Sequence, residues 1–199
     1  MKSFSHRADV ERALTELGRQ LALRDADHVT VLCCGASVLC AMGILSRRTL
    51  DVDAIGTIDG GGNILAIEEF SPEMVEAVAA SGLALDLAPE WFNAAASAIL
   101  SRGLPSGAIR RSERHTFDYG PCLTVRFLDR IDLVALKMFA ALDPHKGRRH
   151  VEDLVEIDPS REELHHGVAW MSSWPSNSAF QEALRRLLEG FDASDLYRA

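Results

Sequence analysis

Residues 29–56, VTVLCCGASVLCAMGILSRRTLDVDAIG, decide the fold that we expect. The apolar start, residues 29–33, is typical of a buried strand, and the small residues 35–37 follow it as a turn. An apolar helix over residues 38–45 and a second strand over residues 49–55 complete the unit. This order predicts an α/β (α+β) fold: a small mixed sheet flanked by helices, with a helical C-terminal region.

The second strand carries two carboxylates. Side chains alternate along a strand, so Asp51 and Asp53 are predicted to share one face, while Leu50 and Val52 share the other. Like charges side by side repel, and they are favoured only where water or a cation neutralises them. Because carboxylate oxygens are the ligands that Mg²⁺ prefers, the pattern favours a divalent-metal site for Mg²⁺ or Mn²⁺.

Composition narrows the function classes. The chain has 199 residues, of which 47 % are hydrophobic, and a net charge of −8, so it is not steered as a whole toward nucleic acid. No apolar run approaches the length of a membrane span, and the N-terminus is polar, so we expect a cytoplasmic protein without a membrane partner. The cysteines lack metal-ligand spacing and are interpreted as small reduced hydrophobes. They are Cys33, Cys34, Cys40 and Cys122.

Periodicity and turn residues predict the remaining elements. We expect a domain over residues 1–157 and a helical extension over residues 158–199 that packs on it. The glycine run 60–62 lacks the Lys-Ser or Lys-Thr of a phosphate loop and is interpreted as a turn. The other expected elements are strands over 64–67, 83–89 and 121–128, and helices over 8–24, 72–80, 89–100, 131–142, 151–157, 161–170 and 178–188.

Two charged residues stand in apolar surroundings. Asp86 is either a cap for the helix that follows it or a third acid facing Asp51 and Asp53, and the residues favour neither reading. Lys137 is the only basic residue between 131 and 142, so it either pairs with a structural acid, reaches water, or binds substrate phosphates. The basic run 145–150 is either a solvated loop or an anion-binding patch.

Together these segments resemble the nucleotidyltransferase fold of the polymerase-beta superfamily, and most closely the branch of abortive-infection and type IV toxin nucleotidyltransferases and their single-domain relatives. In that branch a glycine-containing turn precedes paired acids on a strand. A later segment of the family has the pattern Lys-Leu-x-Ala, followed by a basic stretch that ends in Asp-Leu. Here the matching residues are Gly35, Ala36 and Ser37, then Arg47, Thr49, Asp51 and Asp53, then Lys137, and then Arg148, Arg149, Asp153 and Leu154.

The resemblance implies a metal-dependent enzyme that moves a nucleoside monophosphate from a nucleoside triphosphate to an RNA or protein acceptor. It implies that Asp51 and Asp53 hold two metal ions, that Asp86 completes one metal site, and that Lys137 neutralises the triphosphate. It assigns nucleotide binding to the remaining matched positions. These are the Gly35, Ala36 and Ser37 turn, Arg47 and Thr49, and Asp153, which orients Lys137 or the basic residues.

Two departures from the family keep an alternative open. Cys34 and Ala36 flank Gly35 in place of an intact glycine pair, and His150 stands where relatives place an aspartate. The chain is therefore either an active nucleotidyltransferase or a catalytically silent binding or assembly module of the same fold. One version of the active enzyme is the tRNA-modifying toxin of a toxin–antitoxin pair, whose partner is an antitoxin.

Overall fold

The computed structural model describes residues 2–197, and its contacts divide the chain into two compact units. Unit 1 comprises Met1–Gly103 and Ile109–Asp129, and unit 2 comprises Leu104–Ala108 and Arg130–Ala199. The division falls after Asp129, whereas the sequence led us to expect it after residue 157. α5 (Arg130–Ala141) packs against both α6 (Gly147–Ile157) and α7 (Arg161–Met171), so the three helices belong to one unit. Residues 1, 198 and 199, at the outer ends of the two expected domains, lie outside the described residues.

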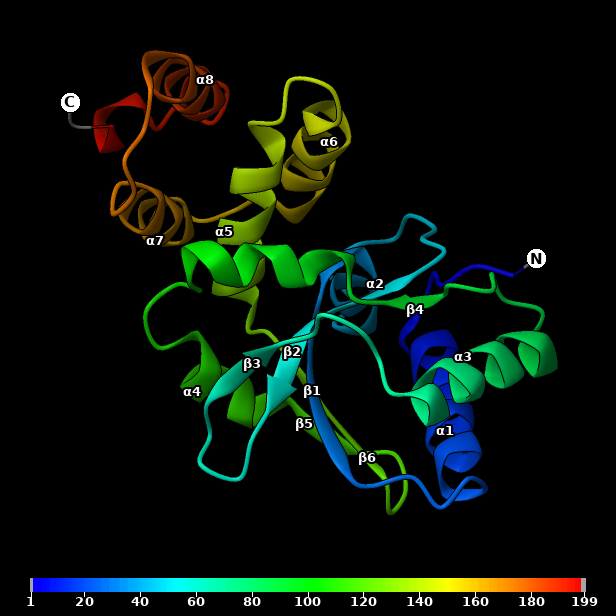
Figure 1. The fold of residues 1–199 in the computed structure, drawn as a ribbon. Helices are drawn as coiled ribbons and strands as arrows, with labels where there is room; N and C mark the ends of the chain where they lie inside the picture. The colour runs from blue at the N-terminus through cyan, green and yellow to red at the C-terminus, as the bar shows by residue number, and fades with distance from the viewer. Residues whose placement is uncertain (1, 198–199) are drawn as a thin grey trace. The chain divides into compact units, whose positions relative to one another are not determined.

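Unit 1 is built on a small mixed sheet, as expected (Figure 1). The strand order is β3-β2-β1-β6-β5, and β4 pairs with β2 outside this path. β1 runs antiparallel to β2 and parallel to β6, so the first strand of the opening stretch lies in the middle of the sheet. The strands are β1 (Val29–Cys34), β2 (Val52–Ile58), β3 (Ile64–Ala66), β4 (Phe92–Asn93), β5 (Thr116–Asp118) and β6 (Leu123–Phe127).

Helices α1 (Arg7–Ala22) and α3 (Pro72–Leu85) pack against each other beside this sheet (Figure 1). The helix expected over residues 8–24 is confirmed as α1, and its apolar side chains, which include Val10, Leu14, Leu17 and Leu21, are buried. α3 begins as its sequence indicates, because the Ser71 hydroxyl accepts a hydrogen bond from the Met74 N–H at 3.2 Å. The other helical elements of this region are α2 (Gly35–Ala41), η1 (Ala95–Arg102), α4 (Ala108–Ser112) and η2 (Glu113–His115).

The strand expected over residues 83–89 is wrong, because α3 continues to Leu85. Gly82 is not a stop signal: a Cβ there would lie 3.2 Å from the Ala88 carbonyl oxygen and from the Trp91 ring. The Trp91 indole N–H is within hydrogen-bond distance of the Val78 carbonyl and the Ser81 hydroxyl, at 3.1 and 3.2 Å. The small residues Ser81 and Gly82 therefore make room for Trp91 and do not mark the end of the helix.

The helix expected over residues 89–100 is also wrong in its first half. Trp91 is fully buried, and its carbonyl accepts a hydrogen bond from the Val52 N–H at 2.6 Å. This contact draws the chain alongside β2, where Phe92 and Asn93 form β4. Helical structure resumes only at Ala95, as the 3₁₀ helix η1.

Unit 2 is helical, as expected for the C-terminal region. Its elements are α5 (Arg130–Ala141), α6 (Gly147–Ile157), α7 (Arg161–Met171), α8 (Ser178–Glu189) and η3 (Ser194–Leu196). α7 starts with a reciprocal capping box between Ser160 and Glu163. α6 starts at Gly147, four residues before the expected start, so Arg148, Arg149 and His150 lie in a helix and do not form a basic loop.

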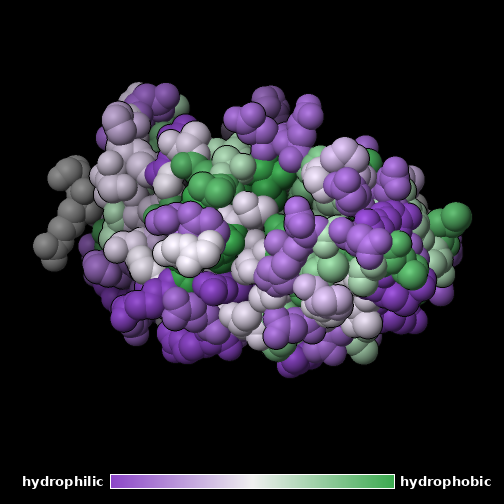
Figure 2. All heavy atoms as spheres, turned by 60° about the horizontal axis from the view of Figure 1, so that its bottom comes forward, coloured by the Kyte–Doolittle hydropathy of each residue, from purple (hydrophilic) through white to green (hydrophobic). Residues whose placement is uncertain are grey.

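Apolar residues reach the surface in several separate areas among hydrophilic ones on the face drawn in Figure 2. Leu83, on α3, is the most exposed of the large hydrophobic side chains, at 87 %. Within residues 2–197, no helix combines the length and the apolar character needed to cross a bilayer.

Candidate functional site

Asp53 lies against the backbone of Gly35. The two segments meet because Cys34 of β1 pairs with Asp53 of β2 in antiparallel register. Gly35 has φ +89°, and a Cβ built on it would lie 2.3 Å from Asp53 Oδ2. Only glycine allows this approach without a shift, so the structure brings together the predicted small-residue turn and the second predicted acid.

Asp51 lies immediately before β2, since the strand begins at Val52 and not at residue 49. Asp51 and Asp53 are both partly buried, whereas Val52 and Ala54 are fully buried, which is the alternation expected if the two acids share a face. Leu50 does not follow this pattern, because it precedes the strand and is 46 % exposed.

Thr49 holds the segment that carries Asp51. Its hydroxyl donates a hydrogen bond to Asp51 Oδ1 at 2.9 Å, and its backbone pairs with Phe4. Thr49 is buried, so it acts through Asp51 in this structure. Arg47 lies in the preceding loop, where its carbonyl accepts from the Cys40 thiol at 3.3 Å and its guanidinium donates to the Arg48 carbonyl.

Ala36 and Ser37 are not in a free turn, because α2 already starts at Gly35. Ser37 does not cap this helix: its N-cap is Cys34, and no side-chain cap bond is formed. Ser37 Oγ is fully buried and has no hydrogen-bond partner among residues 2–197. An unsatisfied buried hydroxyl costs about 1–3 kcal/mol. The stability of the fold therefore does not account for this orphaned hydroxyl, the Ser37 Oγ without a hydrogen-bond partner.

Asp86 is exposed at the C-terminus of α3, in the left-handed conformation with φ +59°. Its carbonyl accepts a hydrogen bond from the Lys2 N–H at 2.6 Å. In the described chain, no three side chains of His, Cys, Asp or Glu are grouped so that they could hold a metal ion. The structure therefore does not bring Asp86 together with Asp51 and Asp53 as a three-acid site. Asp86 is also not a cap for a following helix, as the sequence suggested, because the next helical element begins only at Ala95. It caps the C-terminal end of α3 instead.

Sequence reasoning missed Asn93. The parallel pairing of β2 with β4 sets Asp53 opposite Asn93, whose side-chain oxygen accepts a hydrogen bond from the Ala95 N–H at 2.9 Å. An amide oxygen is a ligand type that accompanies carboxylates around hard cations. We missed Asn93 because we expected a helix over residues 89–100. The adjacent aromatic residues Trp91 and Phe92 were the only sequence feature that indicated a short strand.

The Cys33 thiol near the site is a poor candidate for metal binding or nucleophilic attack. Cys33 is fully buried, and burial, followed by the neighbouring Cys34 and Asp53, raises its pKa well above the ordinary value. A protonated thiol is a weak nucleophile and a poor ligand. All four cysteines are buried and free of disulfides, which confirms their interpretation as reduced small hydrophobes.

Lys137 and Asp153 form a buried pair inside unit 2. Lys137 is 6 % exposed and Asp153 is 1 % exposed, and Lys137 Nζ lies 2.6 Å from Asp153 Oδ2. This contact is the pairing with an acid that the sequence left open for Lys137, while Arg148 of the same helix pairs with Glu152 at 3.1 Å. Asp51, Asp53 and the Gly35 turn belong to unit 1.

Two substitutions test the cap reading, in which Asp86 is the C-terminal cap of α3. Asp86→Asn should leave the free energy of unfolding within about 0.5 kcal/mol, because asparagine tolerates the left-handed conformation. Asp86→Val should lower that free energy by about 1–2 kcal/mol, because a β-branched residue does not tolerate it. Chemical denaturation measures both variants, and a large loss in Asp86→Asn would contradict the cap reading.

Comparisons with protein-family models, with curated proteins and with solved structures found no significant match to this chain. The family resemblance therefore rests on the quoted residues, and the site rests on its geometry.

Proposed function

We propose that this chain is a metal-dependent nucleotidyltransferase that moves a nucleoside monophosphate from a nucleoside triphosphate to an RNA or protein acceptor. The observation that carries the proposal is the approach of the Asp53 carboxylate to the Gly35 backbone, with Asp51 on the same strand edge. A carboxylate pair beside an open backbone turn suits a cation and a polyphosphate together.

The residues present fit Mg²⁺, because this ion is commonly held by one or two carboxylates, with the rest of its shell supplied by substrate phosphates and water. Asp51 and Asp53 would hold it, and Asn93 would add an amide oxygen from β4. The ion would supply charge neutralisation at the phosphoryl group that is transferred.

The chain's own groups account for the rest of the proposed site. The backbone N–H groups around Gly35 are free of side-chain bulk and would donate to phosphate oxygens. The orphaned Ser37 hydroxyl would find its partner there after a small opening of the turn. Thr49 keeps Asp51 in place through its 2.9 Å hydrogen bond. The helix dipole of α2 is not needed for this role, since that helix has only 7 residues.

The decisive experiment incubates the protein with each α-labelled nucleoside triphosphate, Mg²⁺ or Mn²⁺, and total cellular RNA and protein. We expect label in a polymer, and a loss of at least about 100-fold in Asp53→Asn, because several kcal/mol of charge stabilisation disappear. Glu68→Gln is the matched control, since it removes one exposed carboxylate elsewhere in unit 1. Equal losses in both variants, or no label transfer, would contradict the proposal.

A second candidate is a catalytically silent module of the same fold, and the exposed position of Asp86 at the end of α3 favours it. Such a module would give a thermal shift with a nucleoside triphosphate and no label transfer. The toxin version of the enzyme predicts growth arrest on expression that is lost in Asp53→Ala. Harmless expression of an active transferase would exclude that version while leaving the enzymatic proposal intact.

A further inference from the structure

Helix α3 carries apolar residues on the side that faces solvent. Val75, Ala79 and Leu83 follow one another at intervals of four residues, so they form one line along the helix, which we call the α3 stripe. All three are exposed, Leu83 at 87 % and Val75 at 55 %. Another side of the helix, which includes Met74 and Val78, is buried in unit 1. α3 is therefore apolar on both its buried and its exposed sides, which is typical of a helix with packing partners all round.

The α3 stripe is more than a scatter of exposed hydrophobic side chains. Residues 77–85 include no charged side chain, and the one hydroxyl among them, that of Ser81, is buried. Ala79, Ala80 and Ala84 are small, so a second helix could approach α3 closely beside Leu83. Isolated apolar residues on a surface need no explanation, whereas an aligned set marks an interaction site.

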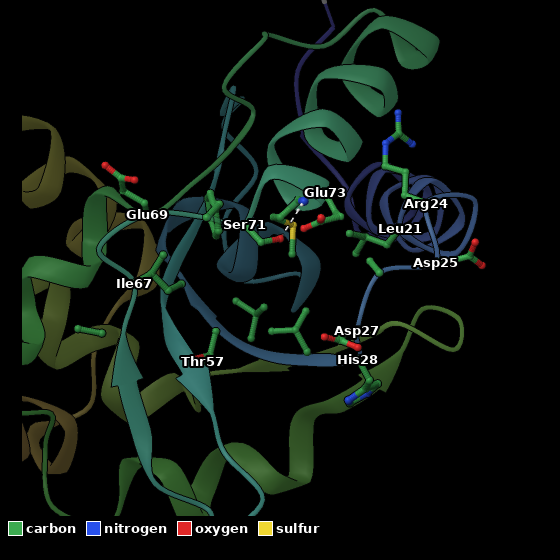
Figure 3. Close-up of a pocket in the computed structure, with 16 residues that line it drawn as sticks. Leu21, Arg24, Asp25, Asp27, His28, Thr57, Ile67, Glu69, Ser71 and Glu73 are labelled. Atoms are coloured by element: carbon green, nitrogen blue, oxygen red, sulfur yellow. Dashed lines mark hydrogen bonds between the residues drawn. The ribbon is translucent and has the colours of Figure 1, made fainter.

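Carboxylates stand at both ends of the α3 stripe. Glu73 and Glu76 lie in the first turns of α3, and Asp86 and Glu90 follow shortly after Leu83. All four side chains are exposed. Figure 3 shows Glu73 at the start of α3, next to α1. A partner that covers the stripe therefore meets negative charge at each end.

Basic residues near the ends of α3 do not reverse this charge. Arg24 Nε lies 3.4 Å from a Glu76 carboxylate oxygen, and the Lys2 N–H donates to the Asp86 carbonyl at 2.6 Å. Along the sequence, residues 49–101 contain nine Asp or Glu and no Lys, Arg or His, whereas the rest of the chain has 20 acidic residues against 21 Lys and Arg. The net negative charge of the protein is thus concentrated in the segment that contains α3.

This charge pattern decides between the possible occupants. A parallel pair of α3 helices from two copies would place Glu73 and Glu76 against the same residues of the other copy. An antiparallel pair would place them against Asp86 and Glu90. Both arrangements bring like charges together, and so does an anionic membrane surface. Charge complementarity therefore requires a partner with basic groups near both ends of its apolar surface.

We propose that the α3 stripe binds an amphipathic helix of another protein, which has apolar residues along one face and lysine or arginine near both ends. Its apolar side chains would be buried against Val75, Ala79 and Leu83, and its basic residues would pair with the carboxylates at the two ends. The three residues of the stripe take no part in the proposed nucleotide site, so the inference does not depend on transferase activity.

The test is fluorescence anisotropy of a labelled helical peptide of about 20 residues, titrated with the full chain. The peptide has leucines spaced by three and four residues and lysines near both ends, and a matched peptide has glutamate at every lysine position. We expect saturable binding of the lysine peptide, at least about tenfold tighter than that of the glutamate peptide. Equal binding of the two peptides, or no saturable binding of the lysine peptide up to about 1 mM, would overturn the proposal.

Matched variants locate the site. Leu83→Gln should weaken binding of the lysine peptide about tenfold, because the apolar surface that the peptide buries is lost. Leu65→Gln, a control on β3 where Leu65 is 52 % exposed, should change it less than about twofold. A thermal melt checks that both variants fold. Equal effects would show general adhesion to exposed apolar side chains and overturn the proposal.

Sedimentation of the chain without peptide tests the remaining occupant, a second copy. We expect the same sedimentation coefficient for the unmodified chain and for Leu83→Gln, because the acidic ends of α3 oppose self-association. A dimer that Leu83→Gln dissociates would identify a second copy as the occupant and would overturn the proposal.

Discussion

Replacing Asp153 with leucine is expected to lower the free energy of unfolding by about 3–5 kcal/mol, because Lys137 would be left as an uncompensated buried charge. Lys137 Nζ lies 2.6 Å from Asp153 Oδ2, and neither residue is more than 6 % exposed. Lys137→Met should also lower this free energy, because the buried Asp153 carboxylate loses the ammonium group that lies 2.6 Å away. Both losses are measured by urea denaturation of the chain, followed through its helical signal.

The double variant Lys137→Met/Asp153→Leu separates charge burial from packing. It should recover most of the loss, because a buried ion pair replaced by apolar residues of similar volume is often neutral. Glu152→Gln is the control, since its partner Arg148 is 93 % exposed at the side chain and the pair should contribute little. A single-variant loss as small as that of the control would mean that water reaches the pair.

Gly35→Ala is expected to lower the free energy of unfolding by about 3 kcal/mol, the sum of left-handed backbone strain and overpacking. The added Cβ would meet Asp53 Oδ2 at 2.3 Å and push the carboxylate away. If the proposed transferase activity is correct, label transfer should fall together with stability. Denaturation curves and the transfer assay on the same preparation check both effects.

Gly43→Ala isolates the contact from the backbone strain. Gly43 also has positive φ, at +72°, but a Cβ there meets nothing within 4 Å. Gly43→Ala should therefore lower the free energy of unfolding by only about 1–2 kcal/mol, the cost of the backbone strain. In an Asp53→Ala background the extra cost of Gly35→Ala should disappear, because the clashing oxygens are gone. An unchanged cost would show that Asp53 is not the neighbour that makes glycine necessary.

Local patterns in the sequence were sufficient for the elements that bury one regular face. The helices expected from residues 8, 72 and 161 and the strand expected from residue 29 all begin at, or one residue before, those positions. These features depend on neighbours within a few residues along the chain, which the sequence lists directly.

The tertiary structure alone decided where the chain between residues 81 and 102 runs. Trp91 draws it alongside β2, so that α3 extends to Leu85, Asn93 comes to lie opposite Asp53, and Asp86 remains at an exposed helix end. Local propensity cannot foresee this arrangement, because the energy comes from burying an aromatic ring among residues remote in the chain. The sequence predicted the acidic pair and its glycine turn. Only the folded sheet decided that Asn93 is the third residue beside them, because the pairing of β2 with β4 joins segments remote in the chain.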